Sequence, residues 1–112
     1  MSYRIYLHFK VLPKWLKLSR NRRREIFENE IQILIGKFRE INFSWIDLEA
    51  FSSDVTDIAE LTTSDIQRYY FFIEELKDSQ FFTEEYFDLV KIQMGIIEGF
   101  KHYEQQQQKE TT

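Results

Sequence analysis

The segment from Tyr3 to Val11 alternates strictly between apolar and polar side chains, and it constrains the fold more than any other part of the chain. A period of two is typical of a β-strand with one buried and one open face. The segment therefore predicts a half-buried strand, and any chemistry is expected on its polar side. The buried side would carry Tyr3, Ile5, Leu7, Phe9 and Val11, and the polar side Arg4, Tyr6, His8 and Lys10.

Two helices are predicted from apolar residues that recur at intervals of three and four. The first would cover residues 19–38, with Ser19 or Asn21 as its N-cap. The second would cover residues 65–78, where Ser64 and Gln67 match a capping box. Each helix carries one apolar stripe, which is expected to pack on the buried side of the strands.

Three further strands are predicted over residues 41–51, 55–62 and 86–96. The first two would form a hairpin around the turn at residues 52–54. Apolar residues move from odd to even positions after Trp45, which predicts a β-bulge next to it. With that bulge, Asp47 and Glu49 would lie on the polar side of the sheet.

The predicted order is strand, helix, strand, strand, helix, strand. With right-handed crossovers, two βαβ units interleave into one four-stranded antiparallel sheet with both helices on a single face. This is the ferredoxin-like βαββαβ arrangement, an α+β fold, and it predicts a single domain over residues 1–104. A short helix over residues 97–104 would end the domain, and the polar residues 105–112 are expected to form a disordered tail.

Composition narrows the classes of function. The 112 residues include no cysteine, which excludes disulfides, thiolate nucleophiles and cysteine-ligated metals. The net charge of −4 argues against general nucleic-acid binding, and no apolar run reaches the roughly 20 residues of a membrane span. We therefore expect a soluble cytoplasmic protein with no cofactor, no nucleic-acid partner and no membrane partner.

Aromatic residues make up 17% of the chain, more than one small core easily buries. Some of these rings are therefore expected to meet a partner subunit, and the uncovered face of the sheet predicts a homodimer.

The uncovered face is also where a small-molecule ligand would bind. Tyr6 and Trp45 would stack on an aromatic ligand, Arg4 and Lys91 would orient its carboxylate, and His8 would form a hydrogen bond. A plainer interpretation is a solvated or dimer-facing surface with charge pairs across the strands.

An enzyme is a second hypothesis for the same face. His8 would act as general base, assisted by Glu60 or Asp47, in a cofactor-independent oxygenase or isomerase. Neither histidine stands in an HExxH motif, and His102 lies in the terminal segment, so no metal site is predicted.

Basic residues concentrate near the N-terminus: eight of the fifteen lysines and arginines lie between Arg4 and Arg24. Cations at the start of a helix oppose its macrodipole, so the run Arg20 to Arg24 calls for an explanation. It could bind an anion at the helix N-terminus, or it could pair with Glu25, Glu28 and an acidic partner surface.

Four segments span nearly the whole chain before the glutamine run: YRIYLHFKVLPKWLKLSRNRRREIF, IDLEAFSSDVTDIAEL, SDIQRYYFFIEELKDSQFF and YFDLVKIQMGIIEGFKHYE. In pattern and order they resemble the darcynin family of small bacterial proteins. The resemblance implies a domain of unknown function and no catalytic residues. The topology is also similar to that of the dimeric α/β-barrel proteins, in which two ferredoxin-like sheets enclose a cavity. That group contains monooxygenases, haem-degrading enzymes and small isomerases, and the similarity implies fold alone.

Overall fold

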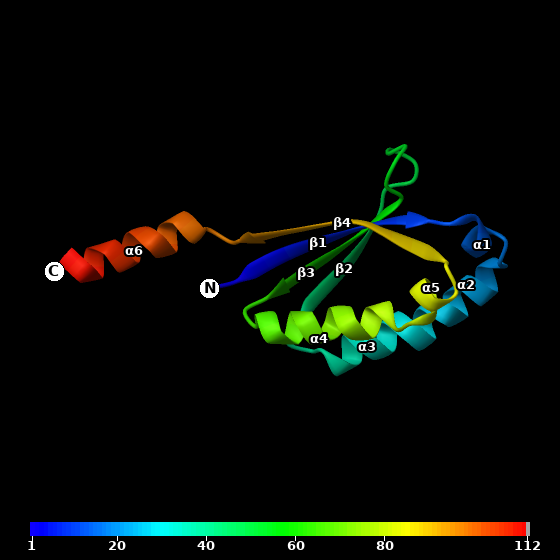
Figure 1. The fold of residues 1–112 in the computed structure, drawn as a ribbon, viewed down its shortest axis with the longest axis horizontal. Helices are drawn as coiled ribbons and strands as arrows, with labels where there is room; N and C mark the ends of the chain where they lie inside the picture. The colour runs from blue at the N-terminus through cyan, green and yellow to red at the C-terminus, as the bar shows by residue number, and fades with distance from the viewer. Residues whose placement is uncertain (112) are drawn as a thin grey trace.

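The computed structural model describes residues 1–111 and places the alternating N-terminal segment inside a four-stranded antiparallel sheet. The strand order is β2-β3-β1-β4, so β1 and β3 are central, as predicted (Figure 1). The strands are β1 (Tyr3–Val11), β2 (Asn42–Asp47), β3 (Asp57–Thr63) and β4 (Phe87–Ile96).

The helices between the strands lie along one face of this sheet (Figure 1). This arrangement confirms the ferredoxin-like α+β fold. Among residues 1–111, no helix is long and apolar enough to cross a membrane. The helical segments are α1 (Pro13–Leu16), α2 (Arg20–Phe27), η1 (Glu28–Gln32), α3 (Ile33–Lys37), α4 (Ile66–Lys77), α5 (Gln80–Thr83) and α6 (Gly99–Thr111), where η1 is a π-helical turn.

Side-chain caps fix where the two long helical stretches begin. Ser19 is the N-cap of α2, because its Oγ accepts a hydrogen bond of 3.1 Å from the Arg22 amide. The capping residue of α4 is Asp65, whose Oδ1 accepts from the Arg68 amide at 3.1 Å. The prediction that Ser64 caps this helix was therefore wrong by one residue.

The core lies between the sheet and the helices. Ile5, Leu7 and Phe9 of β1 are 0–2% exposed, which confirms the buried side predicted for them. The Phe9 ring stacks on Trp45 with 5.5 Å between centroids and an interplanar angle of 9°. Phe38 and Phe72 meet edge to face beneath the same sheet. The aromatic residues thus form much of this core.

The predicted β-bulge in β2 is wrong. Strands β2 and β3 pair in one continuous register, from Asn42 opposite Thr62 to Asp47 opposite Asp57. Ile46 lies within β2 on the open face, opposite Ile58. The strand ends at Asp47, so Leu48 and Ala50 lie in a loop and need no strand register. The register shift falls instead in β4, between the partners of His8 and Phe9.

The structure also differs from the prediction at the C-terminus. Helix α6 includes Gln105 to Gln108, where a disordered tail was expected, because Gln, Glu and Lys are good helix formers. The helix projects from the end of β4, away from the sheet (Figure 1). Thr112 lies outside the described residues.

Candidate functional site

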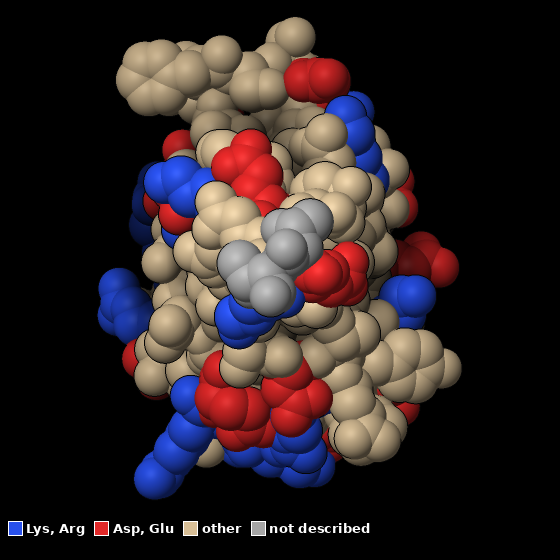
Figure 2. All heavy atoms as spheres, turned by 90° about the vertical axis from the view of Figure 1, so that its left-hand side faces the viewer, with Lys and Arg blue, Asp and Glu red and all other residues tan. Residues whose placement is uncertain are grey.

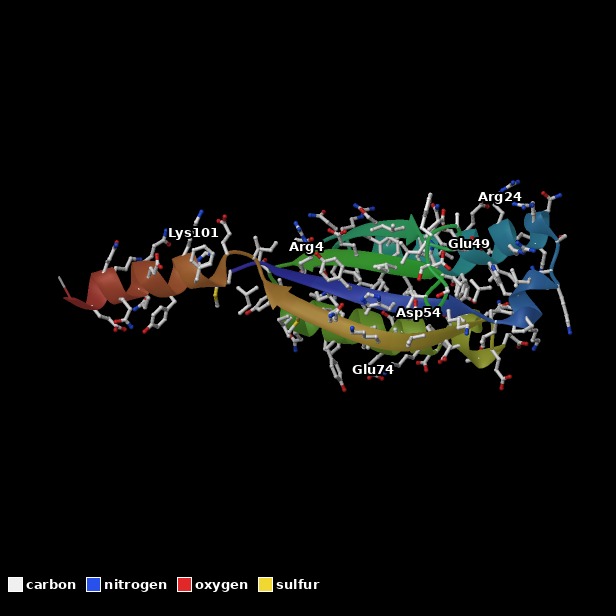
Figure 3. All side chains as sticks on the ribbon, turned by 90° about the horizontal axis from the view of Figure 1, so that it is seen from above. Arg4, Arg24, Glu49, Asp54, Glu74 and Lys101 are labelled. Carbon is white, nitrogen blue, oxygen red and sulfur yellow. The ribbon has the colours of Figure 1, made fainter. Side chains whose placement is uncertain are left out.

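The open face is the side of the sheet turned away from α2, α3 and α4, and Figure 3 looks onto it. Its position follows from the strand register, because residues opposite each other on paired strands share a face. Arg4 pairs with Thr62 and Gly95, Tyr6 with Glu60 and Gln93, and His8 with Ile58 and Lys91.

Two polar contacts order this face. A hydrogen bond of 2.9 Å joins Nε2 of His8 to Oε1 of Gln93. In the neutral tautomer that donates to this amide oxygen, Nε2 carries the proton and Nδ1 carries the lone pair. Arg4 Nε lies 3.4 Å from a carboxylate oxygen of Glu60, on the neighbouring strand. The face therefore holds an oriented imidazole beside an ion pair.

The structure brings together most of the residues predicted for a ligand site. Arg4, Tyr6, His8 and Lys91 share the open face, and Glu60 lies with them. Their roles in binding or catalysis remain predictions.

The structure does not place Trp45 or Asp47 on the open face. The unbroken register of β2 puts both on the helix side, where Trp45 contacts Phe9 and its Nε1 donates to Asp57 at 3.0 Å. Trp45 cannot stack with Tyr6, and Asp47 cannot assist His8 within one chain, because the sheet separates them.

A second group of polar residues gathers at the helix-side end of β2 and β3. Carboxylate oxygens of Asp47, Glu49 and Asp57 all lie within 4.8 Å of one another. They border a cleft of about 180 Å³ whose walls include Trp45 and Arg23. Among residues 1–111, these three acidic residues are the group whose carboxylate oxygens lie close enough together to bind one cation.

Asp57 is the buried member of this acidic cluster, at 4% exposure. Burial raises the pKa of Asp57, hydrogen bonds from Thr56 and Trp45 oppose that rise, and neighbouring Asp47 adds to it. Its two oxygens already accept hydrogen bonds from Trp45 at 3.0 Å and Thr56 at 2.8 Å. A structural role at the end of the hairpin therefore accounts for this carboxylate without a metal.

Sequence reasoning missed Asp57, although a signal was present. Asp57, Ala59 and Leu61 occupy the odd positions of β3, so the carboxylate stands in the series that points into the core. A charged residue on the apolar side of a strand is rarely buried without a partner. The indole Nε1 of Trp45, which donates a hydrogen bond to Asp57, supplies that partner.

The basic run near the N-terminus is partly paired within the chain. Arg22 forms an ion pair of 3.2 Å with Glu25. Arg23 donates to the backbone carbonyl groups of Leu16 and Leu18, and so ties α1 to α2. These contacts favour pairing over an anion site for Arg22 and Arg23.

Charges are interspersed on the end of the molecule that carries α6. Figure 2 shows acidic and basic side chains alternating around this face, with apolar and uncharged atoms between them. Such a mixture creates no extended field of one sign on this face.

The comparisons with known proteins agree with this fold. The family model described as "Darcynin, domain of unknown function" matches residues 2–111. The chain belongs to the Darcynin family. Darcynin 1 of Acinetobacter baumannii is 36% identical over 89 residues, which are 80% of this chain and 99% of the relative. Darcynin of Chromobacterium violaceum is 34% identical over 73 residues, covering 65% of this chain and 92% of the relative.

Solved structures of chlorite dismutase from Candidatus Nitrospira defluvii share the fold. The complex with imidazole superposes with a TM-score of 0.71 at 14% identity, over 84% of this chain and 39% of the enzyme chain. A mutant of the same enzyme gives 0.70 at 14% identity, over 93% of this chain and 47% of the enzyme chain. This darcynin thus spans less than half the length of those chains, and the likeness shows a shared fold.

Proposed function

We propose that this darcynin is a homodimeric binding module that holds a small, partly aromatic anion between two open faces. The observation that carries the proposal is the open face itself, because six of the seven helical segments pack elsewhere and α6 projects away from it. A face with half-buried Tyr6 and His8 gains from being covered.

Three features of the open face support an anionic ligand. Arg4, Lys10 and Lys91 supply positive charge from the two adjacent strands β1 and β4. Tyr6 offers an aromatic ring between them, and His8 offers a hydrogen bond. A carboxylate attached to a ring would meet cations and an aromatic surface at once.

Calorimetric titration with salicylate tests the ligand class, with phenol as the neutral comparison. Salicylate is expected to bind more tightly than phenol, and Lys91→Ala is expected to remove most of that preference. Lys101→Ala is the matched control, because Lys101 lies on α6, away from the open face (Figure 3). Equal affinity for the two compounds, or an equal loss in both variants, would contradict an anion site on this face.

A cofactor-independent monooxygenase or isomerase is the alternative function. The orientation of His8 favours it, because in the neutral tautomer that donates from Nε2 to Gln93 the other ring nitrogen, Nδ1, can accept a proton. Glu60 is the carboxylate on the same face, whereas Asp47 is excluded as its assistant within one chain.

Substitution His8→Ala separates the binding module from the enzyme. An enzyme would lose turnover of its substrate while keeping affinity for it, whereas a binding module would lose affinity without any turnover to measure. If His8→Ala changes neither property, His8 has neither role.

A further inference from the structure

The loop between β2 and β3, residues 48–56, stands out on the open-face side of the sheet. Figure 1 shows it rising from the sheet opposite the helices, and Figure 3 shows its Asp54 in front of the strands. The Glu49 carboxylate instead joins Asp47 and Asp57 in the helix-side cluster. Phe51 in this loop is 92% exposed, the most exposed of the large apolar residues among those described.

Hydrogen bonds hold this loop in one shape. The Leu48 amide donates to the Thr56 carbonyl at 2.8 Å, and the Phe51 amide donates back to the Leu48 carbonyl at 2.8 Å. Asp54 accepts from Ser52 and from the Val55 amide, both at 2.9 Å. The loop thus presents an apolar ring on a rigid support, which favours binding because little entropy is lost on docking.

The loop is fixed to one end of the central strand. Thr56 donates its amide to the Phe9 carbonyl and accepts from the Val11 amide, so the loop stands over the end of β1 that contains Lys10. Arg4 lies at the opposite end of β1, about 20 Å away at the usual rise of a strand.

Two copies that pack face to face can place their loops in two ways. If the strands of the copies run parallel, both projecting loops meet at the same end and keep the two sheets apart. If they run antiparallel, each loop passes over the Arg4 end of the other copy, and the sheets can close. Shape therefore favours the antiparallel dimer, which is an isologous interface.

Charge favours the same arrangement. On the open-face side the loop contributes Asp54 and contains no Lys or Arg, whereas the far end of the open face contributes Arg4. In the antiparallel dimer the acidic loop of one copy approaches that cation of the other. In the parallel dimer the two acidic loops would face each other.

The end of the open face near Arg4 also has space for an aromatic side chain. Gly95 lies directly opposite Arg4 in the pairing of β1 and β4, on the open face. None of the described atoms lies within 4 Å of the position that a Cβ on Gly95 would take. An aromatic ring can therefore lie flat against the backbone of β4 at Gly95, on the strand next to Arg4.

We propose that Phe51 of each copy docks on Gly95 of the other copy and closes both ends of the space between the two open faces. This inference rests on the proposed homodimer and adds its geometry: antiparallel sheets, and a ligand space closed at each end by the loop of one copy.

Engineered cysteines test the contact directly, because the natural chain contains none. The double variant Phe51→Cys with Gly95→Cys is expected to form a covalent dimer on oxidation, seen on a non-reducing gel. Each single variant is expected to stay a monomer on that gel. The matched control is Phe100→Cys with Gly95→Cys, which moves the thiol to an exposed phenylalanine on α6 and is expected to give no covalent dimer.

Sedimentation of non-covalent variants provides the second measurement. Phe51→Ala and Gly95→Leu are each expected to weaken the dimer on the order of a hundredfold, because the symmetric dimer loses two aromatic anchors. Gly95 does not have a positive φ, and space surrounds it, so the leucine leaves the fold intact. Gly36→Leu is the control, since Gly36 has similar space on α3 and is expected to leave the dimer unchanged.

The outcomes separate this inference from the proposed function. If the natural chain sediments as a monomer at every concentration, the face-to-face dimer fails and the loop contact fails with it. If Lys91→Glu and Tyr6→Asp break the dimer while Phe51→Ala and Gly95→Leu do not, the open-face dimer stands and the loop contact is wrong. Cross-linking by Phe51→Cys alone would show loops that meet each other, which overturns the antiparallel arrangement.

Discussion

The two faces of β1 carry alternate residues of one strand, yet they have different roles. On the helix side Ile5, Leu7 and Phe9 are almost wholly buried, whereas on the open side Tyr6 and His8 are only half-buried. Burial of apolar side chains supplies most of the free energy of folding, so the helix side determines stability. The open side is the face on which we propose partner and ligand contacts.

The largest expected effect lies on the helix side. Phe9→Ala should reduce the free energy of unfolding by about 3–5 kcal/mol, because it leaves a cavity among Trp45, Phe82 and Phe87. The matched change on the open side, Tyr6→Ala, should cost less than about 1 kcal/mol at concentrations where the protein is monomeric. Urea unfolding of both variants checks this contrast, and similar losses would contradict it.

Asp57 gives the helix side a dependence on pH. Its raised pKa means that the folded protein keeps a proton on this carboxyl at a pH where the unfolded chain has lost it. The contribution of Asp57 to stability is therefore present below the ordinary aspartate value of 3.8 and is lost as pH rises through the folded-state pKa.

Comparison with Asp57→Asn isolates this effect, because the amide does not titrate. The stability of the natural chain relative to Asp57→Asn should rise as pH falls from about 8 to about 4. Asp88→Asn serves as the control for the loss of one negative charge, since Asp88 is exposed. Parallel pH profiles of the natural chain and Asp57→Asn would mean that burial does not disturb this carboxyl.

A smaller effect on stability is expected at the start of α4. Asp65→Ala should cost about 1 kcal/mol, because the Arg68 amide at the start of α4 loses its acceptor. Ser64→Ala should cost little, since it is not the N-cap. The reverse order of the two losses in thermal unfolding would restore Ser64 as the capping residue.

The smallest effect is expected within the open face. A double-mutant cycle on Arg4 and Glu60 should give a coupling of a few tenths of a kcal/mol in the monomer, because water screens this partly exposed pair. The coupling should decrease further in high salt. A larger coupling that appears only at dimer-forming concentrations would sharpen the contrast between the faces, because covering the pair removes that water.

The strand segments show how far local pattern predicts this fold. The alternation in Tyr3–Val11 assigned each side chain of β1 to the correct face, and the order of elements gave the topology. The pattern failed in the second strand, where apolar residues changed phase after Trp45. Two physical causes produce such a change, a bulge inside a strand and an early strand end, and the sequence alone does not distinguish them.

The prediction of the candidate site was likewise correct for some residues and wrong for others. Arg4, Tyr6, His8 and Lys91 were placed together correctly because they lie on strands with a clear period of two. Trp45 and Asp47 were misplaced because they depended on the assumed bulge. Asp57 was missed because its importance comes from burial and from the approach of Trp45, which lies twelve residues away in the sequence.

By itself, the sequence determined the alternating first strand, the order of the elements and the polar character of the uncovered face, because these follow from periodicities within short segments. Only the tertiary structure decided which face received Trp45 and Asp47, that the acidic cluster forms beneath the hairpin, and that the Phe51 loop rises on the open side. Those features depend on strand register and on where a strand ends, which are set by contacts between distant segments.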